Sequence, residues 1–300
     1  MKKDKKMMAL FLGPIIILFV AVFVYPIIRT IMMSFFAVER PSMKMAEWSF
    51  NGLDNYTKIF DSTFFRTSMV NLFKIWLIGG IFVMCIALLF AVILTSKIRF
   101  AKFYKAAIYV PNVISAVAVA TMWIFYVYNQ RFGLLHDIFA ALGMEELSKM
   151  KWLGADMIFW SMLIAFCFCA VGYYMLIFIS GIEKIPSDLY EAALIDGAGK
   201  VKQFRYITLP LLKGVFKTNI TFWTINATAF FVWTKMFSPI QSENGTITPL
   251  VYMYELIFGS KTVRTTDAGA GAAVGCVLTF CVMVVFLLIN RVVRDNDLEY

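Results

Sequence analysis

The sequence predicts an all-α integral membrane protein with six transmembrane helices and a charged helix-turn-helix loop between the fourth and fifth of them. Of its 300 residues, 61% are hydrophobic and 16% are charged, against about 45–50% and about 25% in an average soluble domain. The apolar residues fall in runs longer than the roughly 18 that mark a membrane span. A segment with acids, bases and glycines interrupts them at 185–210.

Each of six apolar runs is long enough to cross the about 30 Å hydrocarbon core of a bilayer as a helix. The runs cover residues 8–28, 72–94, 106–128, 157–180, 212–236 and 268–290. They are too long and continuous for the strands of a membrane barrel. The first follows MKKDKK but exceeds a signal-peptide core and has no small-residue cleavage site, so we expect an uncleaved span. We therefore expect residues 1–300 to form a single transmembrane domain.

Lysine and arginine gather in the loops on one side of these spans, which holds both termini and the loops 95–105 and 181–211. The longer loops on the other side, 36–71, 129–156 and 237–267, have fewer bases, which acids balance. Positive charge marks the cytoplasmic side of a membrane protein. Both termini and the 185–210 segment are therefore expected in the cytoplasm. Topology also accounts for the net charge of +9, and we expect no nucleic-acid partner.

Residues that carry catalysis or bind metals are scarce. The five cysteines all lie in apolar runs, and the odd number argues against a disulfide framework. The lone His136 removes any two-histidine metal site, and the span interiors lack the paired acids of an intramembrane enzyme. GAGK at 197–200 is followed by valine, not by the Ser or Thr of a Walker A loop. We expect no catalytic residue, no metal, no cofactor in this chain and no ATPase of its own.

The segment 185–210, IPSDLYEAALIDGAGKVKQFRYITLP, predicts two short helices joined by a glycine turn. Pro186 ends the preceding helix, Gly197 and Gly199 end the first short helix, and Pro210 begins the fifth span. Helices this short are marginal alone in water, so their apolar faces need a surface. The residues alone leave two interpretations open: a groove on a cytoplasmic partner, or the lipid surface with its anionic headgroups.

This segment resembles the EAA loop of the permeases of binding-protein-dependent ABC importers, whose pattern is EAA, three residues, glycine and then I-x-LP. Asp196-Gly197-Ala198 after IPSDLYEAA points to the carbohydrate branch. FNGLDNY at 50–56 resembles an element of that branch's first permease subunit, the one similar to the larger maltose permease subunit. One departure is SPIQSENGTITP at 238–249, in place of the family's usual glycine-glycine-proline.

The resemblance implies a coupling role for the loop, which would enter a groove on a cytoplasmic ATPase and transmit its closure to the spans. The implied coupling residues are Glu191, Ala192, Ala193, Asp196, Gly197, Ile207, Leu209 and Pro210. The implied partners are a second, similar permease, two ATPase subunits that bind the ATP, and an extracytoplasmic sugar-binding protein. The implied location is the plasma (inner) membrane of a prokaryote.

The fifth predicted span is unusually polar and is the predicted substrate pathway. A sugar needs hydroxyl partners and a flat apolar surface, and four amide and aromatic residues recur here at spacings of 4, 3 and 4, on one helix face. With two tyrosines of the fourth span, the predicted substrate-binding residues are Asn226, Asn219, Trp223, Phe230, Tyr173 and Tyr174.

Two alternatives stay open for this span. Its polar groups can instead bond neighbouring helices. The solute can also be something other than a sugar, such as glycerol phosphate or a polyamine. Spans three to five lack the mid-span arginine that a phosphate favours and the carboxylates that a polyamine favours.

Overall fold

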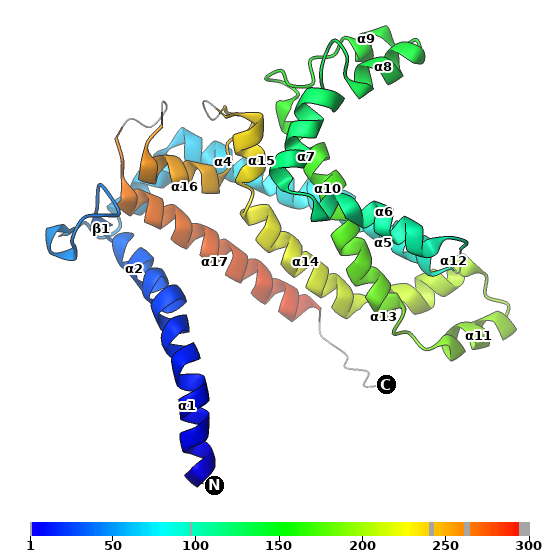
Figure 1. Ribbon diagram of the computed structural model, residues 1–300, viewed down its shortest axis with the longest axis horizontal. Coiled ribbons are helices and arrows are strands. Elements are labelled where there is room, and N and C mark those ends of the chain that lie inside the picture. Colours follow the sequence, from blue (N-terminus) through cyan, green and yellow to red (C-terminus); the bar gives the residue numbers. More distant parts are fainter. Residues whose placement is uncertain (1, 97, 240–242, 261–264, 294–300) are drawn as a thin grey trace. The chain divides into compact units, whose positions relative to one another are not determined.

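The computed structural model describes residues 2–96, 98–239, 243–260 and 265–293, and is mostly helical over them (Figure 1). Its contacts divide the chain into two compact units. One holds the residues up to Arg66 together with Tyr252–Phe280, and the other holds Thr67–Val251 together with the residues from Cys281 on.

Four helical segments are long and apolar enough to cross a membrane: Leu10–Met33, Thr63–Thr95, Ile158–Ile182 and Ala268–Val292. A fifth segment is a bent pair of helices, described below. These spans confirm the prediction of a helical membrane protein, and several of their ends lie within a few residues of the predicted ones. The predicted fifth span, 212–236, does not form one continuous helix.

The first unit consists of α1 (Lys2–Phe19), the π-helix η1 (Val20–Val24), α2 (Tyr25–Met33), β1 (Phe36–Ala37), the 3-10 helix η2 (Met45–Glu47), β2 (Ser49–Phe50), α3 (Asp54–Asp61), most of α16 (Pro249–Phe258) and the first half of α17 (Ala268–Val292). The strands β1 and β2 pair antiparallel, with Phe36 opposite Phe50. A small apolar cluster that includes Met33, Trp48 and Ala272 forms the core beside this pair.

The FNGLDNY stretch at 50–56 has a structural role in this unit. The Asn55 side-chain amide donates to the backbone carbonyls of Ser34 (3.0 Å) and Phe36 (2.9 Å), just beyond the end of α2. A methyl group at Gly269 would stand 2.4 Å from the Phe36 carbonyl oxygen, so only glycine fits this approach. The motif therefore holds the end of α2 against α3 and the start of α17.

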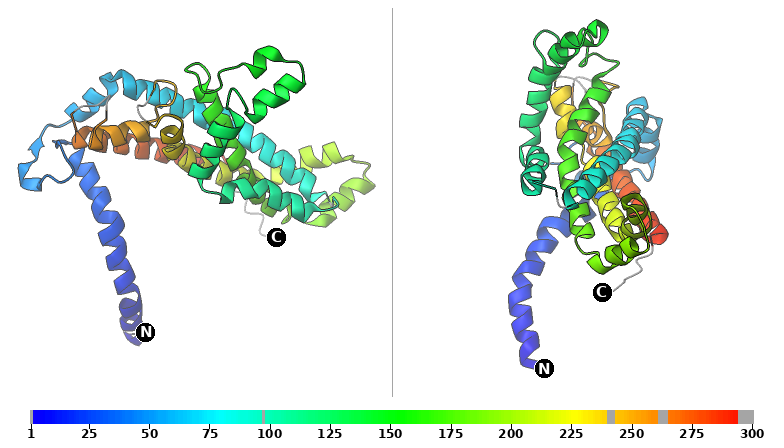
Figure 2. Two further views of the ribbon diagram at one scale, coloured as in Figure 1. Left: turned by 45° about the horizontal axis from the view of Figure 1, so that its top comes forward. Right: turned by 90° about the vertical axis from the view of Figure 1, so that its right-hand side faces the viewer.

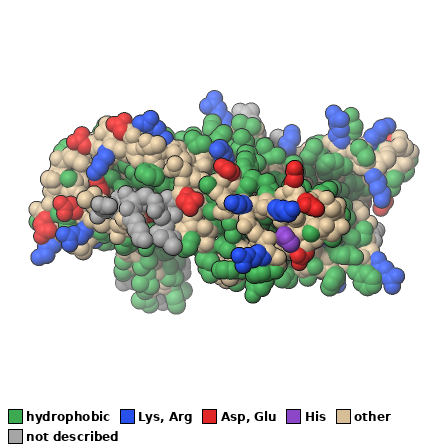
Figure 3. All heavy atoms as spheres, turned by 90° about the horizontal axis from the view of Figure 1, so that it is seen from above, with side chains coloured by type: hydrophobic (Ala, Val, Ile, Leu, Met, Phe, Trp, Pro, Cys, Tyr) green, Lys and Arg blue, Asp and Glu red, His purple; other side chains and the backbone are tan. Residues whose placement is uncertain are grey.

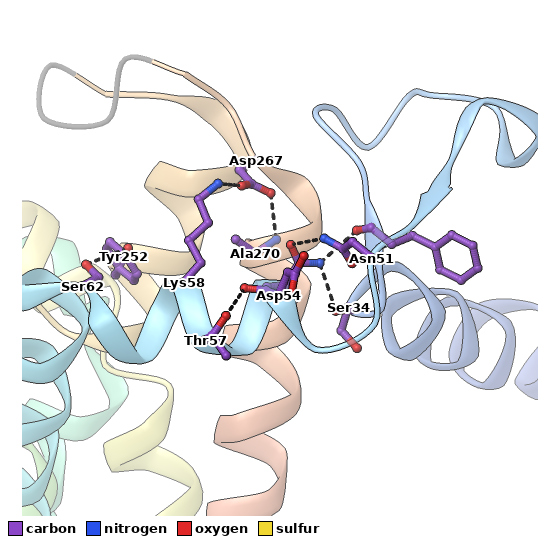
Figure 4. Close-up of polar contacts among 11 residues, drawn as sticks. Ser34, Asn51, Asp54, Thr57, Lys58, Ser62, Tyr252, Asp267 and Ala270 are labelled. Atoms are coloured by element: carbon purple, nitrogen blue, oxygen red, sulfur yellow. Dashed lines mark hydrogen bonds and ion pairs between the residues drawn. The ribbon is translucent and has the colours of Figure 1, made fainter.

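An aspartate caps α17 at the same place (Figure 4). Asp267 Oδ1 accepts a hydrogen bond of 2.9 Å from the backbone N–H of Ala270, and Oδ2 forms an ion pair with Lys58 of α3. A carboxylate at this position satisfies a helix N–H group and interacts favourably with the helix dipole.

The glycines of the stretch DAGAGAAVGCVL, residues 267–278 at the start of α17, allow a close helix contact within this chain. A methyl group at Gly271 would stand 2.6 Å from Ile257 Cγ1, and one at Gly275 would stand 3.4 Å from Met253 Sδ. Both contacts are with α16. The small-residue face therefore packs against α16, as small residues at helix contacts commonly do.

The second unit contains the remaining helices. They are most of α4 (Thr63–Lys74), η3 (Ile75–Gly79, π), α5 (Gly80–Thr95), α6 (Ala101–Val113), α7 (Ala116–Met122), η4 (Trp123–Val127, π), α8 (Leu134–Ala141), α9 (Glu145–Ser148), α10 (Ile158–Ile182), α11 (Ser187–Ile195), α12 (Lys200–Gln203), η5 (Phe204–Thr208, π), α13 (Leu209–Leu211), α14 (Lys213–Thr228) and α15 (Val232–Phe237). α10 is the central helix and packs along α5 and α6 and against α14 (Figure 2).

The predicted third span is bent. α6 and the α7–η4 segment form an angle of 98° at a break after Val113. Ile114 and Ser115 have extended backbone there, and Pro111 has already removed one helix donor. α6 also approaches α10 closely, because a methyl group at Gly172 would stand 2.4 Å from the Ile108 carbonyl oxygen.

The predicted fifth span is broken between α14 and α15. The carbonyl of Phe230, in the break, accepts a hydrogen bond of 2.9 Å from the Thr248 hydroxyl, far along the chain. The Phe231 N–H turns back to the Ala229 carbonyl at 2.8 Å. The Thr248 hydroxyl thus bonds a backbone carbonyl that would bond within the helix if α14 and α15 were continuous. Interrupted helices persist at membrane depth because such partners replace the missing helix bonds.

Candidate functional site

A cavity of about 430 Å³ lies inside the second unit, where the bent and broken helices meet α10. No charged side chain of the described residues contributes to its wall. The wall is formed by Pro111, Asn112, Ile114, Ala116, Phe166, Cys169, Ala170, Tyr173, Tyr174, Phe222, Ile225, Asn226 and Trp233. The wall thus combines two amides and tyrosine hydroxyls with aromatic rings.

Asn226 and Tyr174 form the polar centre of this wall. Asn226 Nδ2 donates to the Tyr174 hydroxyl at 3.0 Å, and Tyr174 is almost fully buried. The Tyr173 and Tyr174 rings meet edge to face at 5.2 Å, and Phe222 packs edge to face on Tyr173 at 6.1 Å. Amide and phenol groups that are already hydrogen-bonded and fixed by ring packing can bind a ligand hydroxyl at little further entropic cost.

Three of the predicted substrate residues lie outside the cavity wall. Trp223 and Phe230 are 2% and 1% exposed and pack against Phe166, with ring centroids 5.4 and 4.8 Å away. Asn219 is fully buried, and neither its amide nitrogen nor its oxygen has a hydrogen-bond partner among the described residues. The structure thus brings Asn226, Tyr173 and Tyr174 together in the wall and places the other three behind it, with the Trp223 ring packed edge to face on Tyr174 at 5.8 Å.

Trp223 and Trp76 bond α14 to the π-helix η3. Trp223 Nε1 donates to the Trp76 carbonyl at 2.7 Å, and Trp76 Nε1 donates to Thr224 Oγ1 at 2.9 Å. The Trp223 indole also packs closely against Gly80. A methyl group at Gly80 would stand 2.6 Å from the indole nitrogen, so only glycine fits there. π-helical turns are frequent at functional sites, and here the turn faces the helix that carries Asn226.

The threonines of α14 bond mainly to their own helix. The hydroxyls of Thr218, Thr221, Thr224 and Thr228 each donate to the carbonyl four residues earlier, at 2.8 to 3.1 Å. Such bonds satisfy a hydroxyl at membrane depth and tend to bend the helix. Thr224 also accepts a hydrogen bond from Trp76 of the neighbouring η3.

We expect Trp223→Phe to lower the free energy of unfolding by about 2 kcal/mol. The change removes one buried hydrogen bond, worth about 1 kcal/mol, and leaves a gap beside two glycines. Thermal unfolding of the detergent-solubilised protein measures the effect. Trp76→Phe is the matched control: Trp76 is less buried and Thr224 keeps its bond to its own helix, so we expect about 1 kcal/mol. Equal shifts would contradict the buried role of Trp223.

The 185–210 segment folds as a helix, a turn and a second helical run. α11 ends in a Schellman motif, in which the Gly197 N–H bonds the Leu194 carbonyl at 3.0 Å and the Ala198 N–H bonds the Ala193 carbonyl at 2.8 Å. Gly197 has φ of +75°, the left-handed conformation that this motif requires. The second run consists of α12, η5 and α13.

The two arms of this segment are joined by a hydrogen bond. The hydroxyls of Tyr190 on α11 and Thr208 on η5 lie 2.9 Å apart, which fixes the arms relative to each other. The tip meanwhile exposes large apolar side chains: Leu194, Ile195 and Val201 are 63%, 87% and 80% exposed. An exposed apolar tip on a braced turn is suited to bind in a groove.

The predicted coupling residues are spread over both arms. Glu191, Ala192, Asp196 and Gly197 are exposed on or just after α11, whereas Ala193 is half-buried. In the second run, Leu209 and Pro210 are exposed and Ile207 is half-buried. The exposed members of the predicted set therefore lie on both arms, four on or just after α11 and two in the second run.

A model of the protein family described as binding-protein-dependent transport system inner membrane component matches residues 84–296, more than half of the chain. The chain belongs to this family. The resemblance deduced from the EAA loop is thereby confirmed, and the protein is an inner-membrane permease subunit with several transmembrane helices.

Curated relatives match most of the permease. The arabinooligosaccharides transport system permease protein AraP of Bacillus subtilis is 30% identical over 281 residues, which are 93% of this chain and 86% of the relative. The diacetylchitobiose uptake system permease protein NgcF of Streptomyces coelicolor is 28% identical over 264 residues, which are 84% and 74% of the two chains.

The fold of the permease is also that of a solved transporter. A chain in the crystal structure of a bacterial alginate ABC transporter in complex with alginate pentasaccharide-bound periplasmic protein matches with a TM-score of 0.79 at 19% identity. The match covers 98% of this chain and 95% of that chain. At this identity the likeness concerns the fold alone.

Sequence reasoning missed several residues of the cavity in the permease. Phe222 lies in the wall although it is off the predicted helix face, Trp233 lies there although it is beyond the four residues predicted for that face, and Asn112 comes from α6. The Pro111-Asn112 pair inside an apolar run was the available signal, since a proline at mid-span marks a possible break.

Proposed function

We propose that the permease forms the substrate pathway of an ABC importer for carbohydrates, together with a second, similar permease. The observation that carries this proposal is the uncharged cavity, in which the Asn226 amide and the Tyr174 hydroxyl lie beside aromatic rings. Amides beside aromatic rings suit both the hydroxyls and the flat C–H faces of a sugar. The relatives that transport arabinooligosaccharides and diacetylchitobiose support the same substrate class.

The uncharged wall favours a sugar over the alternative solutes. A glycerol phosphate or polyamine small enough to lie wholly inside would leave its charge unpaired, since no described residue of the wall carries an opposite charge. An unpaired charge at membrane depth is costly. Hydroxyl groups, in contrast, find partners in Asn112, Asn226 and the two tyrosines.

The 185–210 segment is the proposed coupling element. Its braced turn and exposed apolar tip suit a groove on a cytoplasmic ATPase. Two such ATPases would bind the ATP, and their closure would move this segment and the spans attached to it. In this proposal the broken α14–α15 pair completes six spans, both termini are cytoplasmic, and an extracytoplasmic sugar-binding protein delivers the substrate.

Asn226→Ala tests the site. We expect uptake of labelled oligosaccharides, by cells that express the permease with its partner subunits, to fall about tenfold, because one hydrogen bond of about 1.4 kcal/mol is lost. The association with the ATPase subunits should be unchanged, since Asn226 lies in the cavity wall and not in the 185–210 segment.

Asn219→Ala is the matched control, with the same chemical change on the same helix. Asn219 is buried away from the cavity and makes no hydrogen bond among the described residues. We expect that variant to keep normal uptake. Normal uptake by Asn226→Ala at wild-type expression, or a loss confined to Asn219→Ala, would refute the proposed site.

A further inference from the structure

A second hollow, of about 590 Å³, opens at the far end of the bent third span. It lies between the end of η4, the turn that follows it, and the turn that precedes α10. Ile124 and Tyr128 belong to its wall, as Ala116 at the other end of the same bent span belongs to the inner cavity. Eight residues separate Ala116 from Ile124, about 12 Å of helix, so one segment serves both sites.

Two phenyl rings and two cations surround this hollow. Phe125 and Phe132 are 57% and 63% exposed, and Arg131 and Lys151 carry the charges. The amides Asn129 and Gln130 stand between them, and no acidic side chain of the described residues belongs to the wall. Figure 3 looks down on the side on which α8 and α9 lie in Figure 1, where lysine and arginine side chains stand among apolar and acidic ones.

The turn that presents Arg131 and Phe132 is fixed in advance. Asn129 Oδ1 accepts hydrogen bonds from the backbone N–H groups of Arg131 (2.9 Å) and Phe132 (3.3 Å). Gly133 closes the turn so tightly that a methyl group there would stand 2.3 Å from the Asn129 carbonyl oxygen. The exposed ring and the cation are therefore held by a rigid turn and not by a mobile loop.

The floor of the hollow is equally rigid. The Tyr128 hydroxyl donates to the Ser161 carbonyl at 2.8 Å, and the Ser161 hydroxyl donates to the Trp152 carbonyl at 2.7 Å. The Trp152 ring stacks on Tyr128 at 5.9 Å, and Phe139 stacks on Trp152 at 6.2 Å.

The side chains of Arg131 and Lys151 have no ion-pair or hydrogen-bond partner among the described residues. Both lie in the loop assigned to the extracytoplasmic side, where membrane proteins normally have few lysines and arginines. Lys149 of the same loop is different. It bonds Glu145 at 2.9 Å, and this bond and its charge lower the pKa of that carboxyl. The loop therefore neutralises one cation and leaves the two at the hollow available.

We propose that this hollow is an extracytoplasmic capture site for the anionic group of an acidic saccharide. The phenyl rings would bind sugar faces, the amides would bind hydroxyls, and the two cations would bind a carboxylate. This inference rests on the proposed carbohydrate import and names the substrate class. In this captured state the carboxylate would stay at the mouth, where water still solvates it, and only an uncharged sugar unit of the same saccharide would reach the uncharged inner cavity. The two cations would attract the anionic substrate when the binding protein releases it.

Binding of trigalacturonate to the full chain in lipid nanodiscs, measured by calorimetry at low ionic strength, tests this inference. The fully methyl-esterified trisaccharide is the neutral probe with the same rings. We expect the acid to bind at least tenfold more tightly than the ester, and this preference to vanish in R131Q/K151Q. Lys149→Gln, which removes one charge from the same loop but not from the hollow, should keep the affinity within about twofold.

Three results would overturn the inference. They are equal affinities for the acid and the ester, an unchanged preference in R131Q/K151Q, and pentaglutamate binding as tightly as trigalacturonate, which would make an acidic protein segment the occupant. The assay uses neither ATP nor partner subunits. Its failure therefore leaves the transport proposal standing, and normal uptake by Asn226→Ala leaves this binding result standing.

Discussion

Gly197→Val is expected to reduce ATP-driven uptake at least tenfold while the membrane-spanning part of the permease stays folded. Gly197 has φ of +75° in the turn after α11. A β-branched residue in this conformation costs on the order of 1–3 kcal/mol. The Schellman bonds of the turn would break, and the tip with Leu194 and Ile195 would lose its fixed geometry. The readouts are uptake and co-purification of the ATPase subunits.

Gly199→Val is the matched control for this change. Gly199 lies two residues away in the same loop and also has open space around it, but its φ of −68° and ψ of 166° suit any residue. We expect that variant to keep at least half of the uptake. If both variants kept normal uptake and normal ATPase association, the turn would not be the coupling element.

Hydropathy predicted the long spans well because the apolar run that forms each span can be read from that segment alone. The predicted segments 157–180 and 268–290 correspond to Ile158–Ile182 and Ala268–Val292. The sequence did not predict the break in the fifth span, because the partner of the Phe230 carbonyl is Thr248, which lies 18 residues further along the chain. Local pattern cannot show which carbonyls a distant side chain will satisfy.

The substrate site was predicted in part for the same reason. Spacings of 4, 3 and 4 placed Asn219, Trp223, Asn226 and Phe230 on one face. In the structure the first, second and fourth of these are buried. Asn226 lies at the edge of that face and shares the cavity wall with Phe222 and Ile225. A polar residue at mid-span was a valid signal, but the face that opens to the cavity is set by α10 and α6.

The contact between α6 and α10 sets this geometry, and Gly172→Ala is expected to disrupt it. A methyl group at Gly172 would stand 2.4 Å from the Ile108 carbonyl oxygen and 2.7 Å from Tyr109 Cα. Both are backbone atoms, so no side chain can rotate away and the helices must separate. Overpacking of this kind costs about 3 kcal/mol. Thermal unfolding in detergent should show the loss.

Gly13→Ala separates this steric effect from the ordinary preference of helices for alanine. Gly13 lies in α1, and a methyl group there would meet nothing within 4 Å. We expect that change to be neutral or to stabilise the helix by up to about 1 kcal/mol. Because α6 carries Pro111 and Asn112, Gly172→Ala should also lower uptake in the protein that remains folded. A Gly172→Ala variant with the unfolding temperature of Gly13→Ala would show that the α6–α10 contact tolerates a side chain, and the cavity would then need another explanation for its shape.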